Sequence, residues 1–393
     1  AHKDMFYRAG RVSACGSRIL EDFVPDHTST ALARLDAAGA LDIARLNMVE
    51  FAFGTTGHND HTGAPRNPWN RAHITGGSSS GPAAAVAARL VFGALGSDTG
   101  GSIRLPAACC GLVGIKPTYG RVSRYGAMPL AFSLDTIGPL ARSAADAALI
   151  LGAIAGHDPN DPTTRRAPVP DYSAGLDKGV KGLRIAVPDN YFYDPVTPEV
   201  AALVRASLEV FTGLGAELVP VTLAPSIEHS NAMSMTITTV EAATFHARWL
   251  RDRPGDYGRQ TLSRMLPGLF YPATRYVEAL NLRQKVLADL GTAVFERADV
   301  LHAPIWPFSV PAIEEADVGA NPGFLEYLTA TGHCARPVNY AGLPAVSVPA
   351  GFTENGLPAA FQLIGRPFDE GLLLRMAAAY ERETGCTAHA PPL

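Results

Sequence analysis

Short apolar runs alternate with amphipathic stretches along most of the chain. Three apolar runs are bounded by proline and glycine, as buried strands often are, at residues 111–117, 183–189 and 344–352. Helical periodicity marks five further segments, at residues 28–41, 83–91, 143–156, 198–215 and 371–385. This alternation of strands and helices predicts an α/β fold, in which helices pack around a central sheet.

Local signals support two of these helices and one pair of strands. Ser29 or Thr30 can cap the helix expected at 28–41, and Pro82 stands at the favoured first position of the helix expected at 83–91. The tetrapeptide GLPA occurs at 342–345 and again at 356–359, on either side of the turn FTENG. No longer period accompanies it, so we interpret the repetition as a pair of strands.

Residues 157–182 are rich in turn-forming residues and are the clearest loop of the chain. The apolar run at 183–189 follows directly, so we expect a single large domain, residues 1–393, with a long surface excursion. The length of 393 residues and a hydrophobic content of 47% are enough for one large core.

Charge and cysteine content narrow the function classes. The formal net charge is −4 and five lysines are spread along the chain, so no basic surface for nucleic acid or an anionic membrane is expected. No apolar run approaches the roughly 18 residues that a membrane span needs. The five cysteines lack CxxC spacing, and the first ten residues lack the apolar core of a signal peptide. These features favour a cytoplasmic protein with free thiols and without a zinc site.

Two clusters of glycine and serine, at 76–81 and 99–102, flank the apolar segment 83–91. A flexible linker would not enclose an apolar helix. Residues 77–81 fit the GxSxG elbow of α/β-hydrolases, which would make Ser79 the nucleophile of an esterase. The preceding residues 70–75 are polar, however, whereas an elbow follows a buried strand.

The second cluster, residues 99–102, can offer backbone N–H groups as hydrogen-bond donors. Glycines in Thr99-Gly100-Gly101-Ser102 can turn successive N–H groups toward one point, as an oxyanion requires, and Ser102 ends the loop where a nucleophile would stand. A plain glycine turn between strand and helix is the alternative. Asp98-Thr99-Gly100 matches the aspartic-protease tripeptide, but Asp135 lies in no second copy of it. No histidine stands in a context that marks a base. A desolvated lysine could serve instead, and composition leaves open which lysine that would be.

Several separated blocks of the sequence resemble the amidase-signature hydrolases, in the same order as in that family. They are AHKD at the start, NMVEFAFG (47–54), PRNPWN (65–70), GGSSSGPAAAVAA (76–88), the long block 93–126, SLDTIGPLARSAADAA (133–148) and the segment 337–381. The resemblance covers roughly residues 1–155 and 298–381. It implies the amidase-signature fold, an α/β domain with a central mixed sheet flanked by helices.

The resemblance also implies a Ser–cisSer–Lys triad. It places Ser102 as the nucleophile, Ser78 as the bridging serine after a cis peptide bond, and Lys3 as the base. The N–H groups of Thr99, Gly100, Gly101 and Ser102 are then expected to form the oxyanion hole. Ser80 and Asp98 are expected to support this apparatus by hydrogen bonds.

The activity implied is hydrolysis of a C–N bond in a small-molecule amide or carbamate, through an acyl-enzyme, without metal or cofactor. Apolar candidates for the substrate pocket suggest an aryl amide, an anilide or a urethane. They are Met128, Phe132, Ile305, Trp306, Phe308 and Tyr340. This interpretation expects no nucleic-acid or membrane partner, and it leaves a homo-oligomer open.

The chain departs from the family pattern in two ways. Lys3 lies near the start, where family members have an upstream helix and strand, so we expect a preceding segment. The alternative function is that of the A subunits of glutamyl-tRNA(Gln) amidotransferase, which act as glutaminases with a partner. Those subunits carry a glutamine where this chain has Leu105, and an EASSNLxRYDG block where it has residues 238–250. We therefore expect a stand-alone hydrolase, with residues 157–300 as its variable, substrate-side region.

Overall fold

The computed structural model describes residues 1–317 and 323–392. Within them, ten strands form one mixed sheet in the order β2-β1-β3-β5-β4-β9-β10-β8-β6-β7. The strands are β1 His2–Lys3, β2 Arg45–Leu46, β3 Gly93–Asp98, β4 Val113–Lys116, β5 Thr136–Ala141, β6 Arg184–Pro188, β7 Glu217–Val221, β8 Val300–Pro304, β9 Ala345–Phe352 and β10 Pro358–Ile364.

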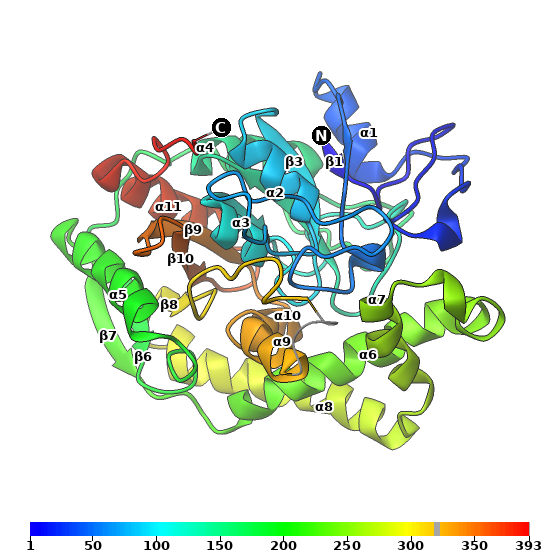
Figure 1. Ribbon diagram of the computed structural model, residues 1–393. Helices are drawn as coiled ribbons and strands as arrows, with labels where there is room; N and C mark the ends of the chain where they lie inside the picture. The colour runs from blue at the N-terminus through cyan, green and yellow to red at the C-terminus, as the bar shows by residue number, and fades with distance from the viewer. Residues whose placement is uncertain (318–322, 393) are drawn as a thin grey trace.

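Two groups of helices contact this sheet (Figure 1). The helices are α1 Thr30–Ala37, α2 Ser80–Ala87, α3 Arg104–Cys110, α4 Ala144–Ile154, α5 Pro198–Gly213, α6 Ser226–Asp252, α7 Arg259–Met265, α8 Ala273–Leu290, α9 Phe324–His333, α10 Arg336–Ala341 and α11 Glu370–Thr384. Short 3₁₀ turns lie at Arg18–Leu20, Glu50–Ala52, Pro254–Asp256 and Leu266–Leu269, and a π turn lies at Gly291–Phe295. In one group α4 packs on α11 and on α1, and in the other α2 packs on α3. The fold expected from the sequence, a single α/β domain with a mixed sheet, is confirmed.

Most of the expected elements are present, with shifted ends. Ser29 does cap α1, because its Oγ accepts a hydrogen bond of 3.4 Å from the Leu32 N–H. The apolar helix expected at 83–91 is displaced: it begins at Ser80, and Pro82 occupies its third position. It ends at Ala87, because Arg89 takes a positive φ of 60° and turns the chain toward β3. The expected strand pair is present: each GLPA segment leads into one of its strands, β9 and β10, which are antiparallel.

The expected variable region, 157–300, contributes β6 and β7 at one edge of the sheet together with α5 to α8. Figure 1 shows α5, β6 and β7 on the left of the molecule and α6, α7 and α8 along its lower right. The elements built from the resembling blocks occupy the rest of the sheet. In particular, β1 lies between β2 and β3 and pairs with both in parallel, which brings the first residues into the interior.

Candidate functional site

The first residues of the chain place a lysine inside the protein. Lys3 ends β1, and its side chain is fully buried. Its Nζ donates hydrogen bonds to Ser78 Oγ at 2.6 Å and to Ser97 Oγ at 2.9 Å. The structure therefore joins two of the three residues that the resemblance assigns to the triad.

Burial changes the proton affinity of this amine. Desolvation disfavours the ammonium and lowers the pKa of Lys3 to about 7, against the opposing charges of Asp135 and Asp98. A lysine with a pKa near 7 is half unprotonated at neutral pH and can accept a proton. The group nearest to the amine that could pass it a proton is the Ser78 hydroxyl.

Ser78 follows a cis peptide bond from Gly77, as the resemblance implies. The Ser78 hydroxyl is fully buried, whereas Ser102 is 6% exposed. The Ser102 carbonyl accepts a hydrogen bond of 3.2 Å from the Ser79 N–H, which holds the two serine loops together. Of the three expected triad residues, Ser102 is thus the one that solvent reaches.

The carboxylate of Asp98 organises the loop that ends in Ser102. It accepts hydrogen bonds from the N–H groups of Gly101 at 2.7 Å and Ile103 at 3.2 Å. It also pairs with the buried Arg104 guanidinium at 3.1 Å and accepts from Asn339 Nδ2 at 2.8 Å. Burial alone would raise the pKa of Asp98, but Arg104 holds it at about 2. The supporting contacts expected of Asp98 are therefore present in the structure.

The same contact removes one expected oxyanion donor. The Gly101 N–H points to Asp98, so it is not directed at a substrate, and only Thr99, Gly100 and Ser102 remain as backbone donors in this loop. Gly101 itself has a φ of +119°, and a Cβ there would lie 2.7 Å from side-chain atoms of Leu105 and Ala335. Its role in the structure is to close the loop tightly around the Asp98 carboxylate.

Ser80 does not make the contacts expected of it. Its hydroxyl is buried and has no hydrogen-bond partner among the residues that the structure describes. Ser80 begins α2, and Ser79 makes the contact instead, because Ser79 Oγ accepts from the Ser97 N–H at 3.4 Å and donates to the Ser97 carbonyl at 3.3 Å. The Ser79 hydroxyl is thus directed at backbone groups of β3.

Two of the six apolar pocket candidates line a cavity. Met128 and Phe132 border a space of ≈ 210 Å³ together with Ser97 and Asp135. Ser97 lines this cavity and its Oγ accepts a hydrogen bond from the Lys3 amine, so the cavity lies beside that amine. The other four candidates pack into apolar clusters instead. They are Ile305, Trp306, Phe308 and Tyr340, and the hydroxyl of the last donates to the Ala279 carbonyl.

Several polar residues that complete the site were not predicted from the sequence. Ser97 was hidden in the SDTGGS block, although its position directly before Asp98 on β3 was the available signal. Asn339 and Gln362 both bind Arg104, which anchors Asp98, and they come from the C-terminal block. Polar residues in the apolar runs around α10 and β10 were the only hint of these contacts.

No group of three or more histidine, cysteine or carboxylate side chains that could hold a metal occurs in the described parts of the chain. Nor does any described helix have the length and apolar character to cross a bilayer. The chemistry that the described side chains offer is that of a buried amine hydrogen-bonded to a serine. An α/β domain with such a site has the features of a serine-dependent hydrolase.

The chain belongs to the amidase family, whose model matches residues 1–374, and it is thereby a C–N hydrolase of that family. It is 42% identical over 406 residues to the glutamyl-tRNA(Gln) amidotransferase A subunit of Geobacter sp. (strain M21), covering 97% of this chain and 82% of that protein. It is 44% identical to the corresponding protein of Myxococcus xanthus (strain DK1622), covering 100% and 84%.

Solved structures agree with this placement. One is described as a vestigial protein complex that reveals the origins of an s-triazine catabolic enzyme. It is 36% identical, has a TM-score of 0.89, and the match covers 98% of this chain and 83% of that one. A bacterial aryl acylamidase of the amidase-signature family is 27% identical, with a TM-score of 0.86 and coverage of 99% and 83%.

These relatives overturn the expectation of a stand-alone enzyme without nucleic acid. That expectation rested on Leu105 and on residues 238–250, two local departures from the amidotransferase pattern. Relatives named for a tRNA amidotransferase nevertheless match 97–100% of the chain at 40–44% identity. Similarity over the whole length outweighs two short segments, so the partner prediction was wrong.

Proposed function

We propose that this chain is an amide-hydrolysing subunit of the glutamyl-tRNA(Gln) amidotransferase type, which releases ammonia from a carboxamide for use with partner proteins and tRNA. The observation that carries the chemistry is the 2.6 Å hydrogen bond between the buried Lys3 amine and Ser78. The names of the relatives at 40–44% identity support the assembly.

In the proposed reaction, Ser102 Oγ attacks the carbonyl carbon of the amide. Its proton passes through the Ser78 hydroxyl to the neutral Lys3 amine. The developing oxyanion accepts hydrogen bonds from the N–H groups of Thr99, Gly100 and Ser102. The C–N bond then breaks, the relay returns the proton to the leaving amine, and Ser102 is left as an ester. Attack by water on that ester, by the same relay, releases the acid and restores Ser102.

The polar groups around Asp98 act as positioning residues in this proposal. Asp98 fixes the Gly101 and Ile103 amides, and Arg104 keeps the carboxylate ionised. Because that ion pair is buried and closed by Asn339, the loop carrying Ser102 is held before any substrate arrives.

The test is ammonia release from glutamine, measured with the full-length protein and the subunits that co-purify with it. We expect release that disappears in Ser102→Ala and in Lys3→Ala, and that falls strongly in Ser78→Ala. Equal release by Ser102→Ala and wild type would overturn the proposed nucleophile. Activity that depends on Ser79 instead would restore the esterase alternative.

A second candidate function is hydrolysis of a small aryl amide or carbamate. The cavity lined by Met128 and Phe132 favours it, as do the similarities to the s-triazine catabolic enzyme and the aryl acylamidase. Aniline release from an aryl amide and from its matched carbamate, beside ammonia release from glutamine, separates the two candidates. Dominant aniline release that Ser102→Ala abolishes would favour this second function, and the ratio of the two rates would show whether it acts as a urethanase.

A further inference from the structure

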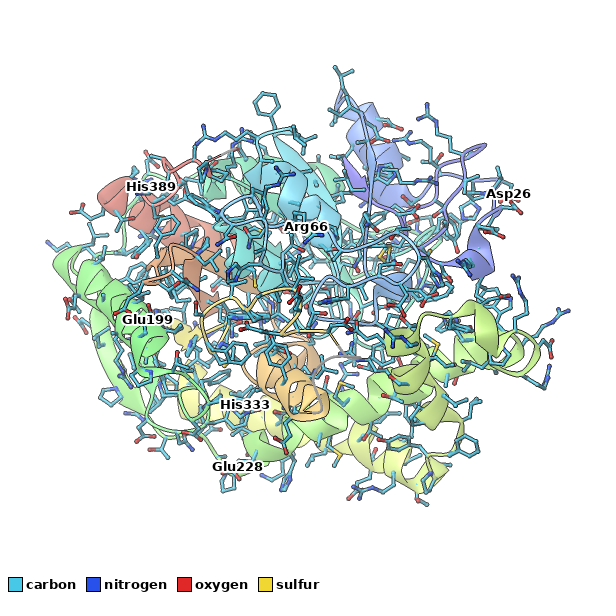
Figure 2. The ribbon with its side chains drawn as sticks, viewed as in Figure 1. Asp26, Arg66, Glu199, Glu228, His333 and His389 are labelled. Carbon is cyan, nitrogen blue, oxygen red and sulfur yellow. The ribbon has the colours of Figure 1, made fainter. Side chains whose placement is uncertain are left out.

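A buried carboxylate borders the site, and the reaction described above does not use it. Asp135 lies directly before β5 and is only 6% exposed. It lines the cavity of ≈ 210 Å³ together with Ser97, whose Oγ accepts a hydrogen bond from the Lys3 amine. Carboxylates such as Asp26 and Glu228, by contrast, lie at the edge of the molecule, where water screens their charge (Figure 2).

The carboxylate of Asp135 is surrounded by hydrogen-bond donors. Its Oδ1 accepts from Thr99 Oγ1 at 2.5 Å and from the Ala131 N–H at 3.1 Å. Its Oδ2 accepts from the N–H groups of Leu130 at 2.9 Å and Ala131 at 3.0 Å. A protonated carboxyl would have to turn its proton toward one of these donors, so the arrangement favours the ionised form.

The contact with Thr99 fixes one of the proposed oxyanion donors. The Thr99 N–H belongs to the same planar peptide group as the Asp98 carbonyl. That carbonyl accepts hydrogen bonds from Thr136 Oγ1 at 2.9 Å and from Asn339 Nδ2 at 3.0 Å. Asp135 and Thr136, which are adjacent in the chain, therefore hold both the side chain and the peptide group of Thr99, and with them the direction of its N–H.

The charge of Asp135 also acts on the Lys3 amine. Burial lowers the pKa of Lys3, and Asp135 opposes this more strongly than Asp98 does. Asp98 is paired with the Arg104 guanidinium at 3.1 Å, which offsets its charge. Asp135 takes part in no ion pair within the described parts of the chain. Its negative charge is therefore the less compensated of the two.

Arg124 is the cation that acts on Asp135 itself. Burial raises the pKa of Asp135, whereas the hydrogen bond from Thr99 and the charge of Arg124 lower it. The Arg124 guanidinium is directed at other groups, because it pairs with Asp161 at 3.7 Å and donates to Thr163 Oγ1 at 2.9 Å. The charge of Asp135 thus remains available to the nearby amine.

The other titratable groups beside this amine are paired or uncharged. Asp4, the next residue along the chain, forms an ion pair with Arg45 of β2 at 3.2 Å. On the other side, His2 Nδ1 lies 3.0 Å from Asp42 Oδ1. Burial raises the pKa of the Cys15 thiol well above its usual value, so this thiol is neutral at pH 7.

We propose that Asp135 is a positioning residue of the hydrolysis, whose carboxylate orients Thr99 for the oxyanion and whose charge stabilises the ammonium that forms when Lys3 accepts a proton. The proposal rests on the proposed amide hydrolysis and adds a residue to it. The proton of the nucleophile passes through Ser78 to Lys3, while Asp135 stays ionised and forms no bond. A buried ammonium is costly, and a nearby negative charge lowers that cost, as the carboxylate of a Ser–His–Asp triad does for its imidazolium.

The test is the pH profile of ammonia release from glutamine, measured with the full-length protein and the subunits that co-purify with it. Asp135→Asn keeps the size of the side chain and removes its charge. We expect the plateau of kcat/KM to fall about 10- to 100-fold, and the acid limb to move to lower pH by about one unit. Asp161→Asn is the matched control, because Asp161 lines the same cavity but is not among the charges that act on Lys3. Its acid limb should stay in place.

Two further variants separate the two roles. Thr99→Val removes the hydroxyl and keeps the Asp135 charge, so kcat should fall about two- to tenfold with little change in KM and no movement of the limb. Asp135→Glu retains the charge and should keep the limb at its wild-type position. A carboxylate that only closes the turn at residues 130–131 would lower activity without moving the limb. An unmoved limb in Asp135→Asn, an equal shift in Asp161→Asn, or a wild-type kcat in Thr99→Val would overturn the proposal.

Titration of the lysines by nuclear magnetic resonance tests the charge without turnover. The chain has five lysines, and the signals of Lys3 and Lys116 are assigned with Lys3→Met and Lys116→Met. Between Ser102→Ala and Ser102→Ala/Asp135→Asn, the Lys3 signal should titrate about one pH unit lower. The Lys116 signal should not move, because Asp135 is not among the charges that act on it. An unmoved Lys3 signal, or an equal shift of both signals, would overturn the proposal.

The same measurements distinguish other causes of failure. If Asp135→Asn does not fold, all five lysines titrate near the usual value of about 10.4, and the kinetics of Thr99→Val and Asp135→Glu decide. Ammonia release that Ser102→Ala retains would contradict the proposed function, while the lysine titration would still report on Asp135.

Discussion

Two lysines of this protein are equally buried and differ in what surrounds them. Lys3 and Lys116 are both fully inaccessible, and burial lowers the pKa of each to about 7. The Lys3 amine donates to two serine hydroxyls, whereas the Lys116 amine donates to the backbone carbonyl of Pro117 at 2.9 Å. A carbonyl cannot pass on a proton, and a hydroxyl can. A lowered pKa therefore does not by itself identify a catalytic lysine. Whether the amine can exchange a proton depends on the group to which it is hydrogen-bonded.

The charges of the buried ion pair of Asp98 and Arg104 act on the two lysines. The Asp98 charge raises the pKa of both amines, and the Arg104 charge lowers that of Lys116. One structural pair thus adjusts both lysines, which gives several ways to test whether only one of them acts as a base.

The largest difference should come from removing each amine. Lys3→Met is expected to lower kcat/KM by about 10²–10⁴-fold, the contribution of a positioned acid–base group, because Ser78 then has no proton acceptor. Lys116→Met should stay within about tenfold of wild type, because that amine donates to a backbone carbonyl, which cannot relay a proton. Steady-state ammonia release from the two variants measures the difference. Equal losses would show that both substitutions lower the activity by disturbing the fold.

Asp98→Asn should have the next largest effect, on stability. It leaves the buried Arg104 charge without its partner and weakens the contact to Asn339, at a cost of about 3–5 kcal/mol. Urea unfolding of wild type and variant measures this cost. Because Asn removes a charge that raises both lysine pKa values, the acid limb of the activity profile should also move to lower pH. A stable variant with an unmoved limb would contradict the electrostatic coupling.

The pH dependence of kcat/KM should reflect the protonation of Lys3 and not that of Lys116. Below its pKa of about 7 the amine is protonated and cannot accept a proton, so kcat/KM should fall about tenfold for each pH unit below 7. The same limb is expected in Lys116→Met. A rate that is flat between pH 5.5 and 7.5 would exclude Lys3 as the base.

The pH dependence of stability, by contrast, should report both lysines. Each folded-state pKa of about 7 lies below the usual value of 10.5, so between these values the unfolded chain binds more protons than the folded one. Stability then rises with pH, by about 1 kcal/mol or more for each lysine between pH 7 and 8.5. Lys3→Met and Lys116→Met should each remove about half of this rise in the urea midpoint. A rise that neither variant reduces would show that other groups titrate.

The smallest effect should come from Ser97→Ala. The substitution removes one hydrogen bond to the Lys3 amine, and leaves the bond to Ser78 in place. A single neutral hydrogen bond of this kind corresponds to a loss of about two- to tenfold in kcat/KM. Ammonia release at saturating and limiting substrate measures it. A loss as large as that of Lys3→Met would mean that Ser97 carries the proton.

Part of this site could be predicted from the sequence. The resemblance places Lys3, Ser78 and Ser102 in three separate blocks, and the structure has Lys3 bonded to Ser78 and a cis bond at Gly77–Ser78, where the resemblance implies it. The catalytic roles of these residues stay a prediction. Two other predictions, Gly101 as an oxyanion donor and Ser80 as a supporting hydrogen-bond partner, do not match the structure for a spatial reason. Which way an N–H or a hydroxyl points depends on the carboxylate or helix that it meets, and spacing does not contain that information.

The buried polar groups from distant segments could not be predicted. Arg336 reaches Gly100 only because α10 packs there, and Gly332 gives no signal by itself that it makes space for a guanidinium. Four of the six apolar pocket candidates lie in apolar clusters for the same reason: side chains such as Ile305 and Tyr340 suit a pocket by their chemistry but are packed in the core. The partner prediction failed because two local departures were weighed above similarity along the whole chain.

The position of β1 has a consequence for the order in which the protein can become active. β1 lies in the sheet between β2 and β3, while the groups that anchor Asp98 lie at Asn339 and, through Arg104, at Gln362. During synthesis on the ribosome, Asp98 and Arg104 are made before the segment that carries Asn339 and Gln362, so these anchors cannot be in place until that segment has been made. A nascent chain that ends before Asn339 therefore carries Ser102 without this support.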